Sequence, residues 1–371
     1  MSVKTPTPRA IPFPTSDGCD LELRRHQGGD KPVLLVHGAS ASSDTFRIGE
    51  TQTLVDHLVD AQFDVWTLDW RASKGRARQV YCKNKLTDFS IDKAAENDVP
   101  AAIAFMRATQ GISQKIDIIA HCMGGAIVTQ GIAQGLLSAD LVGNVVVTAL
   151  GLFYRAAIDN VLKAQDGVLE ELLTVKDQHL LHPTKKWDQM VCQVDPGDGN
   201  WDRLLQDPYE IWLRTPLRHK CIVPICHRIS YMFGMPYLPD NIPTIHANDL
   251  PSQFGYIPVK FLLHCTQNLR RGWAAPFASN ARARSLVSDE TYLNHGPFRG
   301  RKLMLITGDL NSLWHRDSID TMYEWLLRGP RSEQPQIVRK CVLRGYGHQD
   351  LYWGSGAPTD VFKLIVEGLK L

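Results

Sequence analysis

The 371-residue sequence lacks a marked excess of charge of either sign, with 41 lysines and arginines against 39 aspartates and glutamates. A general binder of nucleic acids or of anionic membranes would show a strong basic excess, so neither is expected. No stretch approaches the roughly 18 uninterrupted apolar residues of a transmembrane helix, and we expect no membrane span. The N-terminus, MSVKTPTPRAIPFPTSDG, has no continuous apolar run, and we expect no secretory signal.

Cysteine is sparse and scattered, with eight residues along the chain. Without a signal peptide, this usage is typical of reduced thiols, and we expect a cytoplasmic protein. Cys221 and Cys226, followed by His227, form a C-x4-CH cluster. A zinc site would need a second pair of ligands at short spacing, and none is obvious. We therefore predict buried thiols and no metal.

Short apolar, β-branched segments alternate with segments of helical periodicity in the first part of the chain and again near its end. This order predicts an α/β fold with a mainly parallel central sheet flanked by helices. We expect a core of residues 1–154 and 298–371, split by a large, mostly helical lid insertion of residues 155–297. Asp98 is the expected N-cap of the helix predicted at residues 98–107. The predicted strands are residues 32–37, 63–70, 115–120, 144–150, 302–307 and 338–343, and the predicted helices are residues 98–107, 125–137, 167–174, 209–215, 317–327 and 359–371.

The segment IIAHCMGG, residues 118–125, has a strand, one reactive residue and the start of a helix in succession. Ala120 and Gly124, two residues before and after Cys122, are small, as the tight turn of a nucleophile elbow requires. We predict Cys122 as a nucleophile. The N-terminal amides and the dipole of the following helix are expected to lower the pKa of its thiol.

The segment HGAS, residues 37–40, follows the first core strand and predicts part of an oxyanion hole. A tetrahedral intermediate needs two backbone N–H donors directed at its oxyanion. One is expected from Met123, directly after the nucleophile, and the other from Ala39.

A base and its orienting residue are predicted on two later loops. His348 follows the last predicted strand and can reach Cys122 across the top of the sheet. The orienting group should follow Gly308, where Asn311 has the usual spacing of the acid and Asp309 is a neighbour at a different spacing. An asparagine can hold a neutral imidazole through its carbonyl, so Asn311 is favoured and Asp309 is the alternative.

In this arrangement the chain resembles the α/β-hydrolase superfamily. It is most similar to the cysteine-elbow α/β-hydrolases that accompany, or are fused to, bacterial glucose–methanol–choline (cholesterol-oxidase-like) flavin oxidoreductases. The resemblance implies a Cys-His-Asn arrangement and a possible separate flavin oxidoreductase as partner. A weaker similarity is to polyhydroxyalkanoate synthases and dienelactone hydrolases. The matching segments are AHCMGG at 120–125, CIVPICHRISYMFG at 221–234, TIHANDLPSQFG at 244–255, GDLN at 308–311 and GYGHQDLYWG at 345–354.

These residues predict an enzyme that acts on a lipophilic ester, lactone or thioester, either free or bound to a carrier or to coenzyme A, without a cofactor. Acyl transfer from Cys122 to an alcohol, amine or carbanion is the first alternative, because the family does not choose between hydrolysis and transfer. A non-catalytic binding partner of an oxidase is the second. The candidate substrate-binding residues are His121, Ser40, Trp314 and Tyr231.

Overall fold

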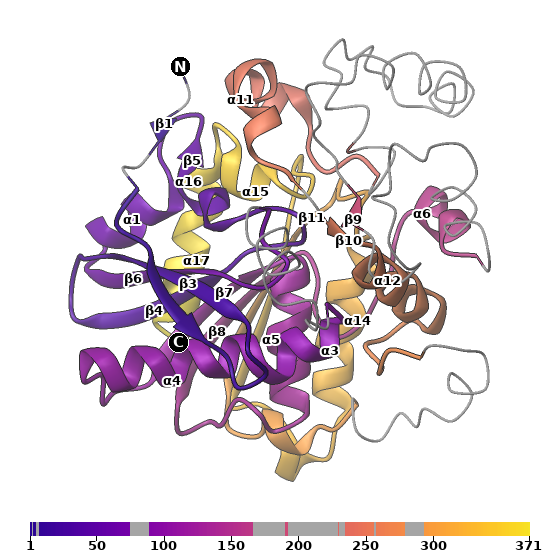
Figure 1. Cartoon of the computed structure of the whole chain (residues 1–371). Coiled ribbons are helices and arrows are strands. Elements are labelled where there is room, and N and C mark those ends of the chain that lie inside the picture. Colours follow the sequence, from indigo (N-terminus) through magenta and orange to yellow (C-terminus); the bar gives the residue numbers. More distant parts are fainter. Residues whose placement is uncertain are drawn as a thin grey trace.

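The computed structural model of the chain (Figure 1) describes residues 1, 3–4, 7–74, 89–165, 190–191, 229, 234–255, 257–278 and 293–371. The helices predicted at residues 167–174 and 209–215 lie outside the described residues, as do Cys221, Cys226 and Tyr231.

An eight-stranded sheet forms the centre of the molecule, in the order β12-β11-β8-β7-β4-β6-β3-β2. The neighbours from β12 to β6 are parallel, and β3 and β2 add an antiparallel edge. All six predicted strands are confirmed. The strands are β2 (Ile11–Pro14), β3 (Asp20–His26), β4 (Lys31–Val36), β6 (Phe63–Asp69), β7 (Ile116–His121), β8 (Val142–Thr148), β11 (Lys302–Gly308) and β12 (Ile337–Leu343).

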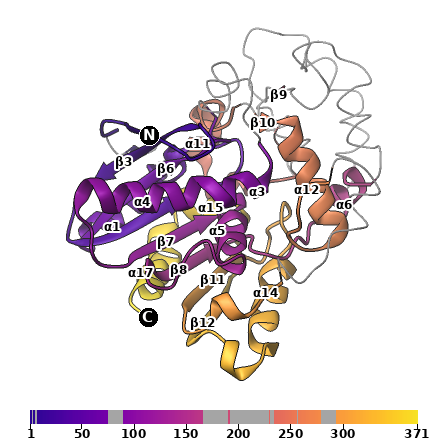
Figure 2. The same ribbon diagram turned by 60° about the horizontal axis from the view of Figure 1, so that its bottom comes forward.

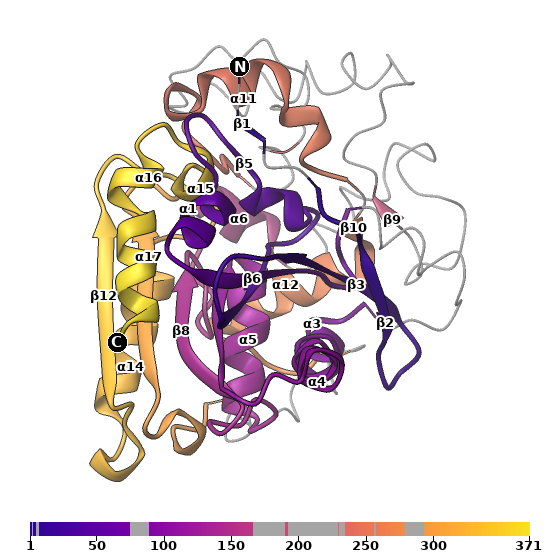
Figure 3. The same ribbon diagram turned by 90° about the vertical axis from the view of Figure 1, so that its left-hand side faces the viewer.

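Helices cover both faces of the sheet and enclose two apolar cores. Helices α1 (Leu54–Asp60) and α17 (Phe362–Leu369) pack on one face. Helices α4 (Val99–Gln110), α5 (Met123–Ala133) and α14 (Asp317–Arg328) pack on the other. Figure 3 shows α17 on one side of the strands and α4 and α5 on the opposite side. The expected α/β layers are therefore present.

The first predicted helix begins earlier than expected, and Asp98 is not its N-cap. The chain runs from α3 (Ile91–Lys93) through a π-helical turn, η2 (Ala94–Asp98), directly into α4. The fully buried Asp98 carboxylate instead accepts hydrogen bonds from the Arg71 guanidinium, at 2.7 Å from Nη2 and 2.9 Å from Nε, and from the Arg71 backbone N–H. A buried carboxylate needs a charged partner more than a helix end needs a cap.

The described parts of the insertion lie at one end of the core. Helix α12 (Val259–Arg271) is next to α6 (Ile158–Lys163), as Figures 1 and 2 both show. The backbone of residues 152–154 bonds to that of residues 272–274, which ties the return of the insertion to its start. Helix α11 (Pro243–Asn248) precedes α12 in the same segment of the chain. No helix within the described residues is long and apolar enough to cross a membrane.

Candidate active site

Cys122 occupies a sharp turn between β7 and α5. Its backbone has φ 56° and ψ −126°, a conformation that costs a side-chain-bearing residue about 1–3 kcal/mol and is found at functional sites. A Cβ at Gly124 would lie 2.4 Å from the Val36 carbonyl oxygen and 2.6 Å from that of His37. The turn therefore requires glycine at that position, as the elbow spacing predicts.

The loop after β4 packs directly against this cysteine. A Cβ at Gly38 would lie 2.9 Å from the Cys122 Cβ and 3.2 Å from its Sγ, so the bare backbone of Gly38 sets the distance between loop and nucleophile. The backbone N–H groups of Met123 and Ala39 both interact with the thiol of Cys122. Both residues also line the cavity beside the sulfur, where an oxyanion would form.

The buried side chain of His37 fixes the backbone of the loop after β4. One ring nitrogen of His37 lies 2.7 Å from the Ser73 hydroxyl and the other 2.7 Å from the Gly38 carbonyl oxygen. The Trp70 indole N–H donates to the His37 carbonyl at 3.1 Å. These contacts fix the backbone on which the Ala39 donor depends.

The thiol of Cys122 is only 6% exposed, and burial raises its pKa to about 11. Interactions with the Met123 N–H, the Trp314 indole and the Ala39 N–H lower the pKa without offsetting that effect. The expectation of a lowered thiol pKa is therefore wrong, because desolvation of the thiolate outweighs the helix N-terminus. The resting thiol keeps its proton near neutral pH and needs a base to remove it.

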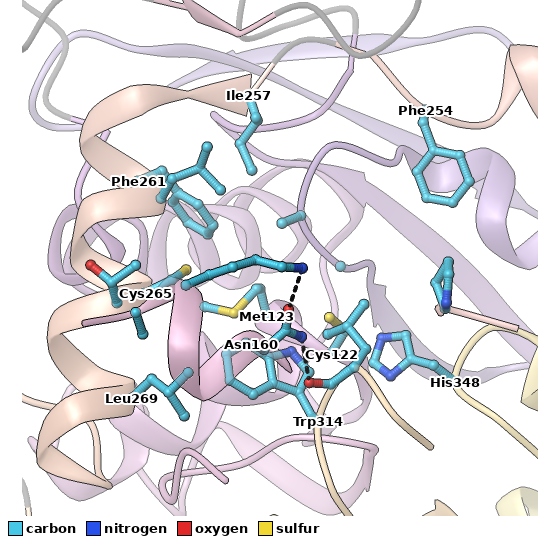
Figure 4. Close-up of a pocket in the computed structure, with 18 of the residues that line it drawn as sticks. Cys122, Met123, Asn160, Phe254, Ile257, Phe261, Cys265, Leu269, Trp314 and His348 are labelled. Atoms are coloured by element: carbon cyan, nitrogen blue, oxygen red, sulfur yellow. Dashed lines mark hydrogen bonds between the residues drawn. The ribbon is translucent and has the colours of Figure 1, made fainter. Parts of the chain in front are cut away.

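His348 lies beside Cys122 and faces the same cavity (Figure 4). Its ring is 1% exposed, and burial lowers its pKa to about 3. The ring centroid is 4.6 Å from that of His121. Neither nitrogen of His348 has a hydrogen-bond partner among the described residues. The imidazole is therefore neutral and has both nitrogens available for proton transfer.

Asn311 and Asp309 flank the loop of His348, but no hydrogen bond in the described part of the chain joins either to its ring. The Asn311 Oδ1 accepts from the backbone N–H of Trp314 at 3.2 Å, while its buried Nδ2 has no partner. The Asp309 carboxylate accepts from the Gly345 N–H at 2.7 Å. Asp309 therefore holds the loop that bears His348, and the choice of orienting residue stays a prediction.

Asp350 holds the same loop from its other side. Its Oδ2 accepts from the Gly347 N–H at 2.9 Å and from Nδ2 of Asn241 at 2.6 Å. Burial raises the pKa of this carboxyl to about 6. Asp309 and Asp350 thus fix the backbone of Gly345 and Gly347, directly before His348.

Of the candidate substrate-binding residues, Trp314 lines the cavity. His121 does not: it is fully buried, with one ring nitrogen 2.9 Å from the Thr148 hydroxyl and the other 3.1 Å from Oε1 of Gln349. Its partners and its ring contact with His348 give it a packing role behind the base.

Ser40 is also fully buried and does not line the cavity. Its backbone has φ 51°, and its carbonyl accepts from the Gly255 N–H at 3.0 Å. Ser40 therefore joins the oxyanion loop to the insertion. Tyr231 lies outside the described residues.

Most of the cavity wall comes from the segment of residues 155–297, and the sequence did not predict which of its residues line the cavity. Helix α12 directs Phe261, Cys265 and Leu269 into the cavity, and Asn160 reaches it from α6 (Figure 4). The spacing of four residues along α12 is that of one helical face and could have indicated this wall. Nothing local in α6 indicates its role.

Four buried histidines make the stability of the fold sensitive to acid. Burial lowers the pKa of His26 and His37 to about 4, that of His348 to about 3, and that of His121 well below its usual value. As the pH falls from about 6.5 towards 4, the unfolded chain binds these protons and the folded chain does not. Each histidine then removes up to about 1.4 kcal/mol of unfolding free energy per pH unit.

We expect urea denaturation to show nearly constant stability between about pH 7 and 8 and a steep loss between pH 6.5 and 4.5. His26→Gln should reduce the slope by about one proton. A stability independent of pH over this range would contradict the neutral, buried state of these rings.

A family model described as the alpha/beta hydrolase fold matches residues 31–181, which include the elbow. No curated protein matches the chain. A carboxyl esterase from Bacillus coagulans is similar in structure, with 13% identity, a TM-score of 0.55, and coverage of 98% of this chain and 100% of that one.

An epoxide hydrolase from Vigna radiata is similar at 14% identity and a TM-score of 0.53, covering 98% of this chain and 97% of that one. A lipase in an open form is similar at 12% identity and a TM-score of 0.54, covering 98% of each chain. At such identities the shared property is the fold. Sheet order, elbow and comparisons agree that the chain has the α/β-hydrolase fold.

Proposed function

We propose that the protein is a cysteine-dependent acyl hydrolase that acts on a lipophilic ester, lactone or thioester through a Cys122 acyl-enzyme. One observation supports this above all. Cys122 sits on a strained elbow, its thiol interacts with the N–H groups of Ala39 and Met123, and it shares a cavity with His348. A buried structural cysteine needs none of these features.

In the acylation half-reaction, His348 accepts the thiol proton as the sulfur attacks the substrate carbonyl carbon. The new C–S bond forms while the carbonyl π electrons move to oxygen, and the N–H groups of Ala39 and Met123 bind that oxyanion. When the intermediate collapses, the bond to the leaving group breaks and imidazolium His348 returns the proton to it. The product is a thioester on Cys122.

In deacylation, neutral His348 removes a proton from water as the water oxygen attacks the thioester carbonyl. The same two N–H groups bind the second oxyanion. The C–S bond then breaks, the sulfur recovers the proton from His348, and a carboxylic acid leaves. Thiol and imidazole are both neutral again, as their pKa values of about 11 and about 3 require near pH 7.

The substrate class follows from the cavity wall. Phe254, Ile257, Phe261, Leu269 and Leu313 surround the opening above the sulfur. Such a wall favours an aliphatic or aromatic acyl chain over a sugar or a peptide. It also disfavours water, so transfer of the acyl group to a lipophilic alcohol or amine is the second candidate.

A substrate panel tests the proposal. Purified protein should be incubated with p-nitrophenyl acyl esters, lactones and acyl thioesters of increasing chain length, and acid release measured with and without an added alcohol acceptor. We expect turnover that rises with chain length. A new ester in the presence of the acceptor would favour transfer over hydrolysis. Absence of turnover with every member of the panel would contradict both, and would favour a binding role.

A further inference from the structure

In helix α6, apolar side chains are exposed to solvent and a lysine side chain is buried. Ile158 is 72% exposed and Leu162 is 43% exposed, whereas Lys163 is only 7% exposed. Folding alone favours apolar side chains inside and lysine outside, because burying an ammonium group costs far more than exposing an isoleucine. The inversion indicates that the inward position of Lys163 serves a purpose other than packing.

Lys163 lines the same cavity as Cys122. Its Nζ donates to Oδ1 of Asn160 at 3.0 Å, and Nδ2 of Asn160 donates to the Leu313 carbonyl oxygen at 3.2 Å. Figure 4 draws both hydrogen bonds as dashed lines at Asn160, within the ring of residues around the sulfur. The ammonium group is therefore held at a defined place on the cavity wall.

Among the described residues that line the cavity, Lys163 is the one with a full charge near neutral pH, and none is acidic. Burial lowers its pKa to about 8, while Asp159, with Oδ2 4.0 Å from Nζ, raises it. A cation on a mostly apolar wall attracts an anion, because little water screens the pair.

We propose that Lys163, held by Asn160, binds a carboxylate at the far end of the acyl chain, so that the preferred substrates are half-esters or half-thioesters of lipophilic dicarboxylic acids. This inference rests on the proposed function and names its substrate class. The apolar wall receives the methylene chain, the elbow receives the ester, and the ammonium group receives the carboxylate. A charge-assisted hydrogen bond of this kind discriminates by about 10- to 100-fold.

The test compares the mono-p-nitrophenyl ester of suberic acid with p-nitrophenyl octanoate, which has the same chain length and no charge. The wild-type protein should prefer the suberate half-ester in kcat/KM, and Lys163→Met should lower that preference at least about tenfold. Lys163→Arg should retain the preference. Lys115→Met, at an exposed position, is the matched control and should change nothing.

A binding measurement separates failure of this inference from failure of the proposed function. Calorimetry should show wild-type protein binding suberamic acid more tightly than octanamide, with the difference lost in Lys163→Met. If suberamate binding depends on Lys163 but no ester is turned over, the anion site stands and the acyl chemistry fails. If esters are turned over and Lys163→Met leaves both the kcat/KM ratio and the binding difference unchanged, the anion site is overturned.

Discussion

The Cys122→Ala variant is expected to lose at least about 10⁴-fold in kcat/KM towards an activated ester while keeping its fold. The substitution removes one buried sulfur atom and leaves the elbow backbone intact, so the urea midpoint should change little. Activity should fall because the substitution removes the nucleophile that the proposal requires at the elbow. Cys341→Ala is the matched control, since Cys341 lies on the edge strand β12, away from the cavity.

Cys122→Ser adds a sharper comparison. A serine hydroxyl is a far weaker acid than a thiol, and the base available to it has a pKa of only about 3. Serine should therefore recover little of the lost activity, although it fits the same space. Substantial activity in Cys122→Ala would show that Cys122 is not the nucleophile.

The His348→Ala variant is expected to lose about 10³- to 10⁴-fold in kcat/KM, because a thiol of pKa about 11 cannot lose its proton unaided near neutral pH. The double variant with Cys122→Ala should be no worse than the worse of the two single variants, since the residues act as a unit. Exposed His315 provides the control substitution.

The pH dependence of the wild-type enzyme should reflect the neutral state of Cys122 and His348. Burial lowers the pKa of His348 to about 3 and raises that of Cys122 to about 11, so the neutral pair predominates throughout the range between these values. With an uncharged ester, whose binding does not depend on the charge of Lys163, we expect kcat/KM to stay nearly constant from about pH 6 to pH 9. A rise through this range with an apparent pKa near 8 would indicate a thiolate in the resting enzyme and contradict the neutral pair.

Local signals allowed the core of the fold and the elbow to be predicted. Strands β4 and β11 are nearly continuous apolar runs, which is typical of parallel strands buried on both faces. The turn at Cys122 is encoded by Gly124, which backbone contacts make obligatory. The antiparallel strand β3 was not predicted, because its central Arg24 and Arg25 pair with Asp69 and Asp64 on β6 and conceal the strand pattern.

Properties that depend on distant parts of the chain could not be predicted. The pKa of the Cys122 thiol is decided by burial, to which the insertion contributes Phe261 and Leu262. Which face of α6 turns towards the cavity also could not be predicted from the sequence, since Lys163 has the sequence context of an ordinary surface lysine. Association with a flavin oxidoreductase stays a prediction from the resemblance.

The most direct test of the central claim is intact mass spectrometry of the protein after rapid acid quench during turnover of a p-nitrophenyl acyl ester. We predict a mass increase of one acyl group, located on the peptide that contains Cys122. Hydroxylamine should remove this group, as expected for a thioester, and Cys122→Ala should not carry it. Acylation of a different residue during turnover, or an equal adduct in Cys122→Ala, would contradict it.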